Sequence, residues 1–168
     1  MADTTSTIPT PTTEPVGGTP AEGRWFLDIW MKVLCDGDAT GGAMSVIEWQ
    51  GGAGFSPPLH VHHEEDTAML VLDGVLTVLV GETERTCGPG DVAWLPRDVA
   101  HSFRVDSETA RYVEMITPAG FERFHVEGSR EVTGDEFLPE PTPVDVPALV
   151  AHAAEHRCDI IGPPMAPR

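Results

Sequence analysis

Short runs of alternating apolar and polar residues, separated by tight-turn pairs, constrain the fold of this chain more than any other feature. Alternate side chains of an extended strand face opposite sides, so a period of two is typical of strands with one buried face. In RWFLDIWMKVL (24–34) this period predicts one strand whose shared face holds Trp25, Leu27, Ile29, Met31 and Val33. Further strand candidates are AMSVIEW, AMLVL, VLTVLV, DVAWL, HSFRV and RYVEMIT.

The turns between these runs indicate how the strands connect. Asp73-Gly74, Gly81-Glu82 and Pro89-Gly90 are turn-forming pairs between neighbouring candidates. Many short strands joined by such turns predict an all-β fold, an antiparallel sandwich or barrel. Near the end, Asp145 is a typical helix N-cap and Pro147 suits a first turn, so we expect one short C-terminal helix.

The length of 168 residues is enough for one domain. Residues 1–22 contain mostly Thr, Pro and Gly and too few large apolar side chains to offset the entropy of ordering, so we expect a flexible N-terminal tail. The barrel is expected over residues 23–128. Residues 129–168 form a C-terminal segment that carries the helix.

Charge and leader signals narrow the expected partners and location. Acidic residues outnumber basic ones 27 to 10, a formal charge of −17 that would repel nucleic-acid backbones and anionic membranes. The N-terminal residues include no apolar leader run, and the three scattered cysteines fit reduced thiols. We therefore expect a cytoplasmic protein that binds neither nucleic acid nor membrane.

Three histidines carry the strongest chemical signal. His60 and His62 are two residues apart in a strand-like run, so they project from one face, whereas His63 points away. His101, in a later run, shares a face with Phe103 and Val105. Two histidines from one strand and a third from another can converge inside a small barrel and bind a first-row transition metal.

Two segments resemble the two conserved motifs of the cupin superfamily. The first carries the spacing of Gly54, His60, His62, Thr67 and Gly74, and the second that of Gly90, Pro96 and His101. The chain is also similar to small monocupins of the quercetin-dioxygenase-like and polyketide-associated kinds. This resemblance implies a cupin double-stranded β-helix, a jelly-roll barrel, with the metal inside.

One departure from the cupin pattern affects the chemistry. The first motif usually places a glutamate ligand where this chain has Thr67, and a neutral hydroxyl is a poor ligand and a poor base. Three alternatives stay open: a three-histidine site, which we prefer, a site that Asp66 joins after a shift of one residue, or a pocket without metal. Glu64 and Glu65 are expected to be solvated turn residues.

These residues predict a metal-dependent enzyme with a small-molecule pocket. His60, His62 and His101 would hold Fe, Mn, Ni, Co or Zn, with Asp66 as a tentative base. The expected pocket lining is Thr67, Met69, Val71 and Phe103, which suits an aromatic or polyketide-like substrate. The preferred activity is that of a non-haem dioxygenase, and we expect a homodimer. The alternatives are a non-redox cyclase, isomerase or dehydratase, or a binding protein without catalysis.

The HAAEH run at 152–156 matches the HxxEH pattern of some zinc proteases. That mechanism needs a third ligand from a well-separated downstream element, and only twelve residues follow His156. We therefore interpret this run as a solvated helix face.

Overall fold

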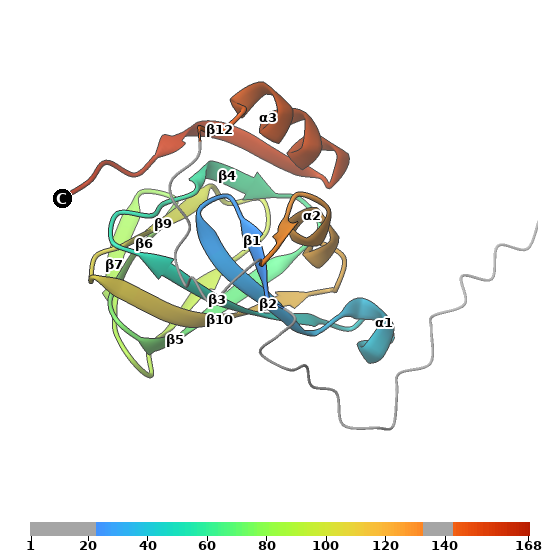
Figure 1. Cartoon of the computed structure of the whole chain (residues 1–168), viewed down its shortest axis with the longest axis horizontal. Coiled ribbons are helices and arrows are strands. Elements are labelled where there is room, and N and C mark those ends of the chain that lie inside the picture. Colours follow the sequence, from blue (N-terminus) through green and yellow to red (C-terminus); the bar gives the residue numbers. More distant parts are fainter. Residues whose placement is uncertain (1–22, 133–142) are drawn as a thin grey trace, which may run out of the picture.

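Two antiparallel sheets face each other and form a barrel, which confirms the predicted all-β jelly roll with a C-terminal helix (Figure 1). The structure is a computed structural model that describes residues 23–132 and 143–168. The predicted N-terminal tail, residues 1–22, lies outside the described residues.

The larger sheet has seven strands in the order β11-β1-β2-β3-β10-β5-β8. In chain order these strands are β1 Arg24–Phe26, β2 Ile29–Cys35, β3 Ser45–Gly52, β5 Asp66–Asp73, β8 Val92–Leu95, β10 Thr109–Thr117 and β11 Arg130–Glu131.

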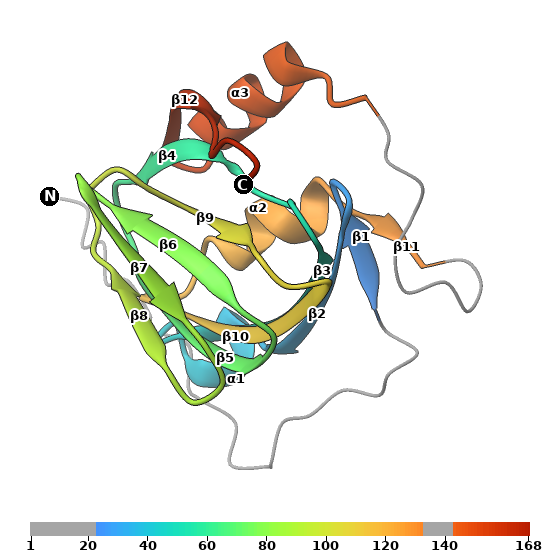
Figure 2. The ribbon, with the colours of Figure 1, turned by 90° about the vertical axis from the view of Figure 1, so that its left-hand side faces the viewer.

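The smaller sheet has five strands in the order β12-β4-β9-β6-β7, and Figure 2 shows it packed across the barrel from the larger one. Its strands are β4 Pro58–His62, β6 Leu76–Val80, β7 Thr83–Cys87, β9 His101–Val105 and β12 Cys158–Pro164.

The described residues include three helices, α1 Gly37–Thr40, α2 Glu122–Glu127 and α3 Val146–Glu155. As expected, Asp145 caps α3: its Oδ1 accepts a hydrogen bond from the Ala148 backbone N–H at 3.1 Å. No helix among the described residues is long and apolar enough to span a membrane.

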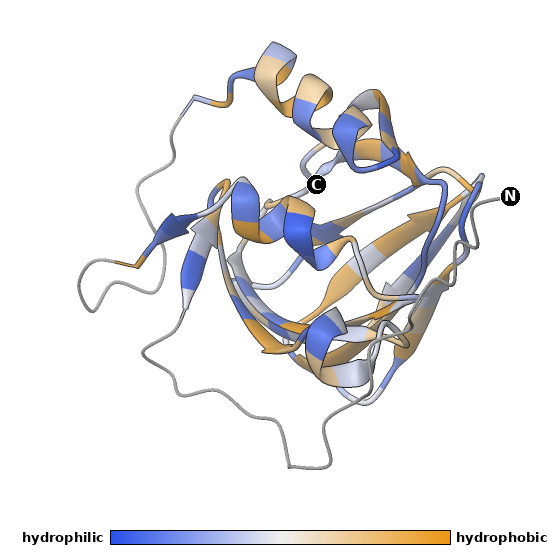
Figure 3. Ribbon diagram, turned by 90° about the vertical axis from the view of Figure 1, so that its right-hand side faces the viewer, coloured by the Kyte–Doolittle hydropathy of each residue, from blue (hydrophilic) through white to orange (hydrophobic). Residues whose placement is uncertain are grey.

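Alternating burial along the strands places the core between the sheets, where apolar residues face inward. Figure 3 shows that hydrophobic residues occur along the barrel strands. In β5, Thr67, Met69 and Val71 are buried, whereas the residues between them are only partly covered. Gly74 ends this strand with φ of 79°, and a Cβ there would lie 2.3 Å from the Thr109 carbonyl oxygen. Only glycine fits this turn of the first motif.

The prediction of one strand over 24–34 was wrong. Leu27 adopts φ of 51°, and the chain reverses so that β1 pairs antiparallel with β2, with Phe26 opposite Ile29. The turn shifts the alternation, and both Phe26 and Ile29 are buried. Leucine is rare in the left-handed region, so the sequence gives no signal of this turn.

The C-terminal segment joins the barrel through β12, a strand that the sequence analysis did not anticipate. β12 pairs with β4, with Cys158 opposite His62 and Ile160 opposite His60. Gly162, Pro163 and Pro164 disfavour an internal strand, but β12 lies at the sheet edge, where proline is tolerated. The last residues of the chain therefore support the strand that carries two of the candidate ligands.

Candidate metal centre

The structure brings His60, His62 and His101 together. β4 carries the first two, and β9 places His101 directly opposite His60 in the register. The ring centroids are 5.0 Å apart for His60 and His62, 4.5 Å for His60 and His101, and 4.9 Å for His62 and His101. One ring nitrogen from each histidine lies within 4.8 Å of the other two.

Backbone carbonyls fix the orientation of two of these rings. His60 Nδ1 lies 2.7 Å from the Pro58 carbonyl oxygen, and His101 Nδ1 lies 2.8 Å from that of Val99. A carbonyl only accepts, so each Nδ1 carries the hydrogen and each Nε2 keeps a free lone pair. Metal-binding histidines are commonly held by such a second hydrogen bond.

His62 has no hydrogen-bond partner on either ring nitrogen, although its side chain is buried. Buried polar groups are normally satisfied, so an unpaired imidazole beside two free Nε2 atoms is a gap that a cation would fill. The donor set therefore fits a first-row divalent metal, with imidazole nitrogen as the ligand type.

The three histidines have lowered pKa values. Burial and the neighbouring His101 lower the pKa of His60 to about 4. Burial lowers the pKa of His101, and burial with the neighbouring histidines lowers that of His62 well below its usual value. All three rings are therefore neutral near pH 7, which is the form that binds metal.

His63 points away from the cluster. Its Nδ1 lies 2.7 Å from Asp98 Oδ1, and its Nε2 lies 3.2 Å from Asp159 Oδ2. Asp98 has φ of 61°, the conformation for which the second motif usually uses glycine, and aspartate tolerates it better than most residues.

Asp66 does not face the histidines. Its Oδ2 accepts a hydrogen bond from Arg97 Nη2 at 2.7 Å, and its Oδ1 accepts one from the Arg97 backbone N–H at 2.9 Å. These bonds lower the pKa of Asp66 and make it a weak base. Because Thr67 points into the core, the adjacent residue of the strand must point out. The tentative role of Asp66 as a base therefore has no support in this geometry.

The residue at the usual glutamate position, Thr67, is 1% exposed, and its Oγ1 has no hydrogen-bond partner. Glu65 differs from the expected solvated turn residue, since it is 6% exposed and its Oε2 is also unpaired. Burial and the neighbouring Glu64 raise the pKa of Glu65 to about 7. Its carboxylate does not belong to the cluster of close ligand atoms around His62.

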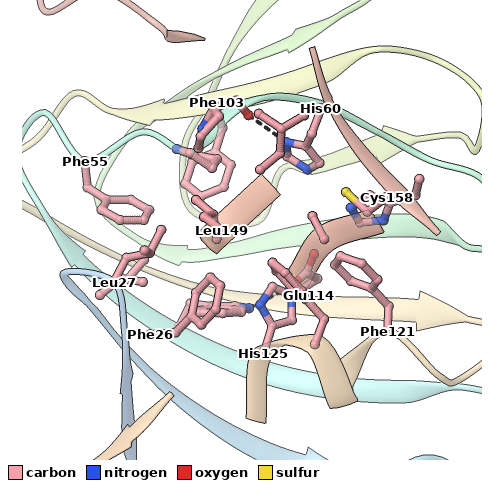
Figure 4. A pocket seen from close by; sticks show the side chains of 18 of the residues that line it. Phe26, Leu27, Phe55, His60, Phe103, Glu114, Phe121, His125, Leu149 and Cys158 are labelled. Carbon is pink, nitrogen blue, oxygen red and sulfur yellow. Dashed lines mark hydrogen bonds between the residues drawn. The ribbon is translucent and has the colours of Figure 1, made fainter. Parts of the chain in front are cut away.

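A cavity adjoins the histidines, and its walls are mostly aromatic (Figure 4). Of the predicted lining residues, Phe103 lines it, whereas Thr67, Met69 and Val71 are buried in the core and do not. The other aromatic residues that line it are Phe26, Trp49, Phe55, Tyr112, Phe121 and Phe124.

Two titratable residues of the cavity wall were missed by the sequence analysis. Glu114 of β10 accepts a hydrogen bond from Trp49 Nε1 at 2.8 Å, and burial raises its pKa to about 7. His125 of α2 is buried against the Trp49 ring, with centroids 4.8 Å apart, and neither ring nitrogen has a partner. Burial and the neighbouring His60 lower the pKa of His125 to about 3.

Sequence signals for both residues exist. In RYVEMIT, the period of two places Glu114 on the same face as Tyr112 and Ile116, an inward carboxylate among apolar residues. In the short α2 region, Phe121 and His125 are four residues apart and share a helix face.

The cavity is small, about 80 Å³. Pockets for drug-sized ligands are typically about 300–1,000 Å³, so this cavity has room for only a few waters. α2 contributes Phe124 and His125 to the wall, and α3 contributes Leu149 and Ala153. These two helices, called the cap below, lie at one end of the barrel (Figure 1). A larger substrate would require the cap to move.

Comparisons with known proteins agree with this geometry. The family described as "Cupin domain" matches residues 45–116. A quercetin 2,3-dioxygenase from Bacillus subtilis is 35% identical over 81 residues, 48% of this chain and 24% of that protein. The chain thus spans about a quarter of the length of this relative.

Two solved structures share the fold at low sequence identity. A predicted oxalate decarboxylase from Thermotoga maritima matches with a TM-score of 0.56 and 18% identity, over 61% of this chain and 97% of that one. KdgF from Halomonas sp. matches with a TM-score of 0.52 and 17% identity, over 56% and 83%. At this identity the likeness concerns the fold alone.

Proposed function

We propose that this chain, of which residues 45–116 match the cupin domain family, is a metal-dependent enzyme that oxidises an aromatic or polyketide-like small molecule. The observation that carries the proposal is the buried, unpaired imidazole of His62 beside the free Nε2 atoms of His60 and His101. When bound there, a divalent ion would polarise a substrate oxygen and, if it is redox-active, support chemistry with dioxygen.

The cavity wall supports the choice of substrate class. Seven aromatic side chains line it, so a planar apolar molecule would pack well there, and few polar groups are available to recognise a sugar or phosphate. The similarity to a quercetin dioxygenase points the same way, although it covers only part of that enzyme.

Glu114 is the proposed base, in place of the carboxylate absent at Thr67. Its pKa of about 7 lets it take up or release a proton near neutral pH, which is optimal for general acid-base catalysis. Trp49 Nε1 donates to one oxygen of this carboxylate and so orients it in the cavity wall. Leu149 and Phe124 of the cap would exclude water once substrate is bound.

A second candidate is a non-redox isomerase, cyclase or dehydratase. The pairing of a carboxyl group and an unpartnered imidazole, Glu114 and His125, in one apolar cavity favours it, because such reactions need only proton transfer.

Oxygen uptake with a panel of flavonols and aromatic polyketides tests the proposal. We expect the metal-loaded protein to consume dioxygen together with substrate. The His101→Ala variant should consume neither dioxygen nor substrate. Loss of substrate without oxygen uptake would favour the second candidate. Recovery of a tightly bound ligand chemically unchanged would contradict both.

A further inference from the structure

A second cluster of metal-ligand type lies on the outer side of the cap. Glu127 ends α2, His152 lies in α3, and His156, four residues on, is the C-cap of α3. One ligand atom from each of the three residues lies within 4.8 Å of the other two. The two histidine rings have centroids 4.9 Å apart, and His156 Nε2 lies 3.1 Å from Glu127 Oε2.

The ring of His152 is already fixed. Its Nε2 donates to the Phe124 carbonyl oxygen at 2.9 Å, and the ring stacks on Phe124 with centroids 4.8 Å apart. Both histidines are only partly exposed, at 23% and 17% of the side chain. Little side-chain freedom would be lost when they bind an ion, and such preorganisation favours binding.

We propose that Glu127, His152 and His156 form a second divalent-metal site, of the kind that zinc occupies, which joins α3 to α2. Two imidazoles and one carboxylate are a ligand set that zinc accepts, with the fourth position left to water. The acidic chain, with a formal charge of −17, favours cation binding in general.

In this site the HAAEH run would supply ligands to an ion that joins two helices, whereas the protease pattern implies a catalytic zinc. The missing third ligand comes from upstream, from Glu127 of α2, and not from a downstream segment. Glu155, the glutamate of the pattern, is not part of the three-residue cluster. Glu127 and His152 also line a surface pocket of about 430 Å³. The role that we propose for the ion is structural, because its ligands come from both α2 and α3.

The location of the site connects it to the substrate cavity. Phe124, on which His152 stacks, is itself part of the cavity wall, as are Leu149 and Ala153 of α3. An ion held by residues of both helices would stabilise the closed cap. Because the cavity is only about 80 Å³, a larger substrate would require the cap to move, and an ion that joins its two helices would oppose that movement.

Zinc titration of the full chain tests the proposal, with calorimetry and thermal unfolding as readouts. In the His62→Ala background, which removes a ligand of the inner cluster, we expect one zinc equivalent per chain. We also expect a zinc-dependent rise in Tm of about 5 °C, the size that ligand linkage gives for a domain of this length. His156→Gln and Glu127→Gln should abolish both.

The matched control is Glu131→Gln on β11, which removes an equal charge from an exposed residue outside the cluster. It should bind zinc like its parent. In hydrogen exchange, zinc should slow the amides of α3 in the parent and leave them unchanged in His156→Gln. Equal zinc stoichiometry and an equal Tm rise in the parent and in folded His156→Gln would overturn the proposal.

Discussion

Thr67 stands where the cupin motif that this chain resembles usually has a glutamate. It lies in the buried face of β5, and its hydroxyl has no partner, so a carboxylate introduced there would enter the barrel interior. If the metal binds in that part of the barrel, the new carboxylate becomes a ligand and raises the affinity for the metal.

We expect Thr67→Glu to bind a first-row divalent ion at least about tenfold more tightly than the wild type, because a fourth, anionic ligand is added to three neutral ones. Thr67→Gln is the control, since glutamine has nearly the same volume as glutamate but carries no charge. Calorimetric titration with Ni²⁺ or Mn²⁺ distinguishes them. Equal affinity of the two variants would mean that position 67 does not face the ion.

Glu114 should make stability depend on pH. Its folded pKa of about 7 lies above the usual 4.5, so the folded state binds more protons than the unfolded state between these values. Stability from this group is thus fully present below about pH 4.5 and is lost as pH rises through about 7. We expect Glu114→Gln to be more stable than the wild type at pH 8, by on the order of 1–3 kcal/mol.

Urea unfolding of the metal-free proteins at pH 4.5 and pH 8 measures this difference. The advantage of Glu114→Gln should shrink at the lower pH. A constant difference at both values would show that Glu114 titrates normally.

At the scale of elements, the alternation and the turn pairs were enough to predict most strands, because buried and partly covered residues alternate along β3 and the first six residues of β5. The hairpin at Leu27 could not be predicted, since leucine rarely adopts the positive φ that this turn has. β12 escaped prediction for a similar reason. Its pairing with β4 depends on tertiary contact and not on local propensity.

The site residues also divide into those that local sequence predicts and those that depend on tertiary contact. His60, His62 and His101 could be predicted as a group because spacing within strands fixes which side chains share a face. The cavity lining could not be predicted, because it depends on how α2 and α3 pack on the barrel. Phe103 was anticipated. The face that Glu114 and His125 share with buried neighbours can be read from the sequence, but the cavity that they line depends on that packing.

The junction between α3 and β12 offers a test of element geometry. Arg157 follows the helix with φ of 56°, the position where helices commonly use glycine, and its side chain is 68% exposed in a weak ion pair with Glu64. We expect Arg157→Gly to stabilise the protein by about 0.5–1 kcal/mol. Arg157→Ala keeps the unfavourable backbone conformation and should give no gain in chemical denaturation. Equal stability of the two variants would contradict this explanation.

At the scale of the whole molecule, the barrel holds three buried histidines, His62, His101 and His125, and the partly buried His60, each with a lowered pKa. Unfolding lets them bind protons near their ordinary pKa of about 6.5, so the unfolded state gains protons first on acidification. The contribution of these groups to stability is present above about pH 6.5 and is lost as pH falls towards about 4.

His125→Phe isolates part of this effect. It keeps an aromatic ring among Phe26, Trp49 and Phe121 and removes one titrating group. We expect the metal-free variant to lose less stability than the wild type between pH 7 and pH 5 in urea unfolding. A parallel loss in both proteins would mean that His125 is already accessible to protons in the folded state.

The expected homodimer and the absence of nucleic-acid and membrane partners stay predictions at this scale. The central claim is narrower: His60, His62 and His101 form an inner metal centre, and everything proposed for the chemistry of this protein depends on that ion.

Metal content per chain tests this claim most directly, by elemental mass spectrometry on untagged protein purified without added metal. The measurement uses the His156→Gln background, so that the outer site does not contribute, and compares His62→Ala with His63→Ala. His63 is the matched control because it is adjacent but points to Asp98 and Asp159. We predict near one equivalent of a first-row ion with His63→Ala and near zero with His62→Ala. Equal content in the two variants, or none in either after reconstitution with iron, manganese, nickel, cobalt and zinc, would contradict the account.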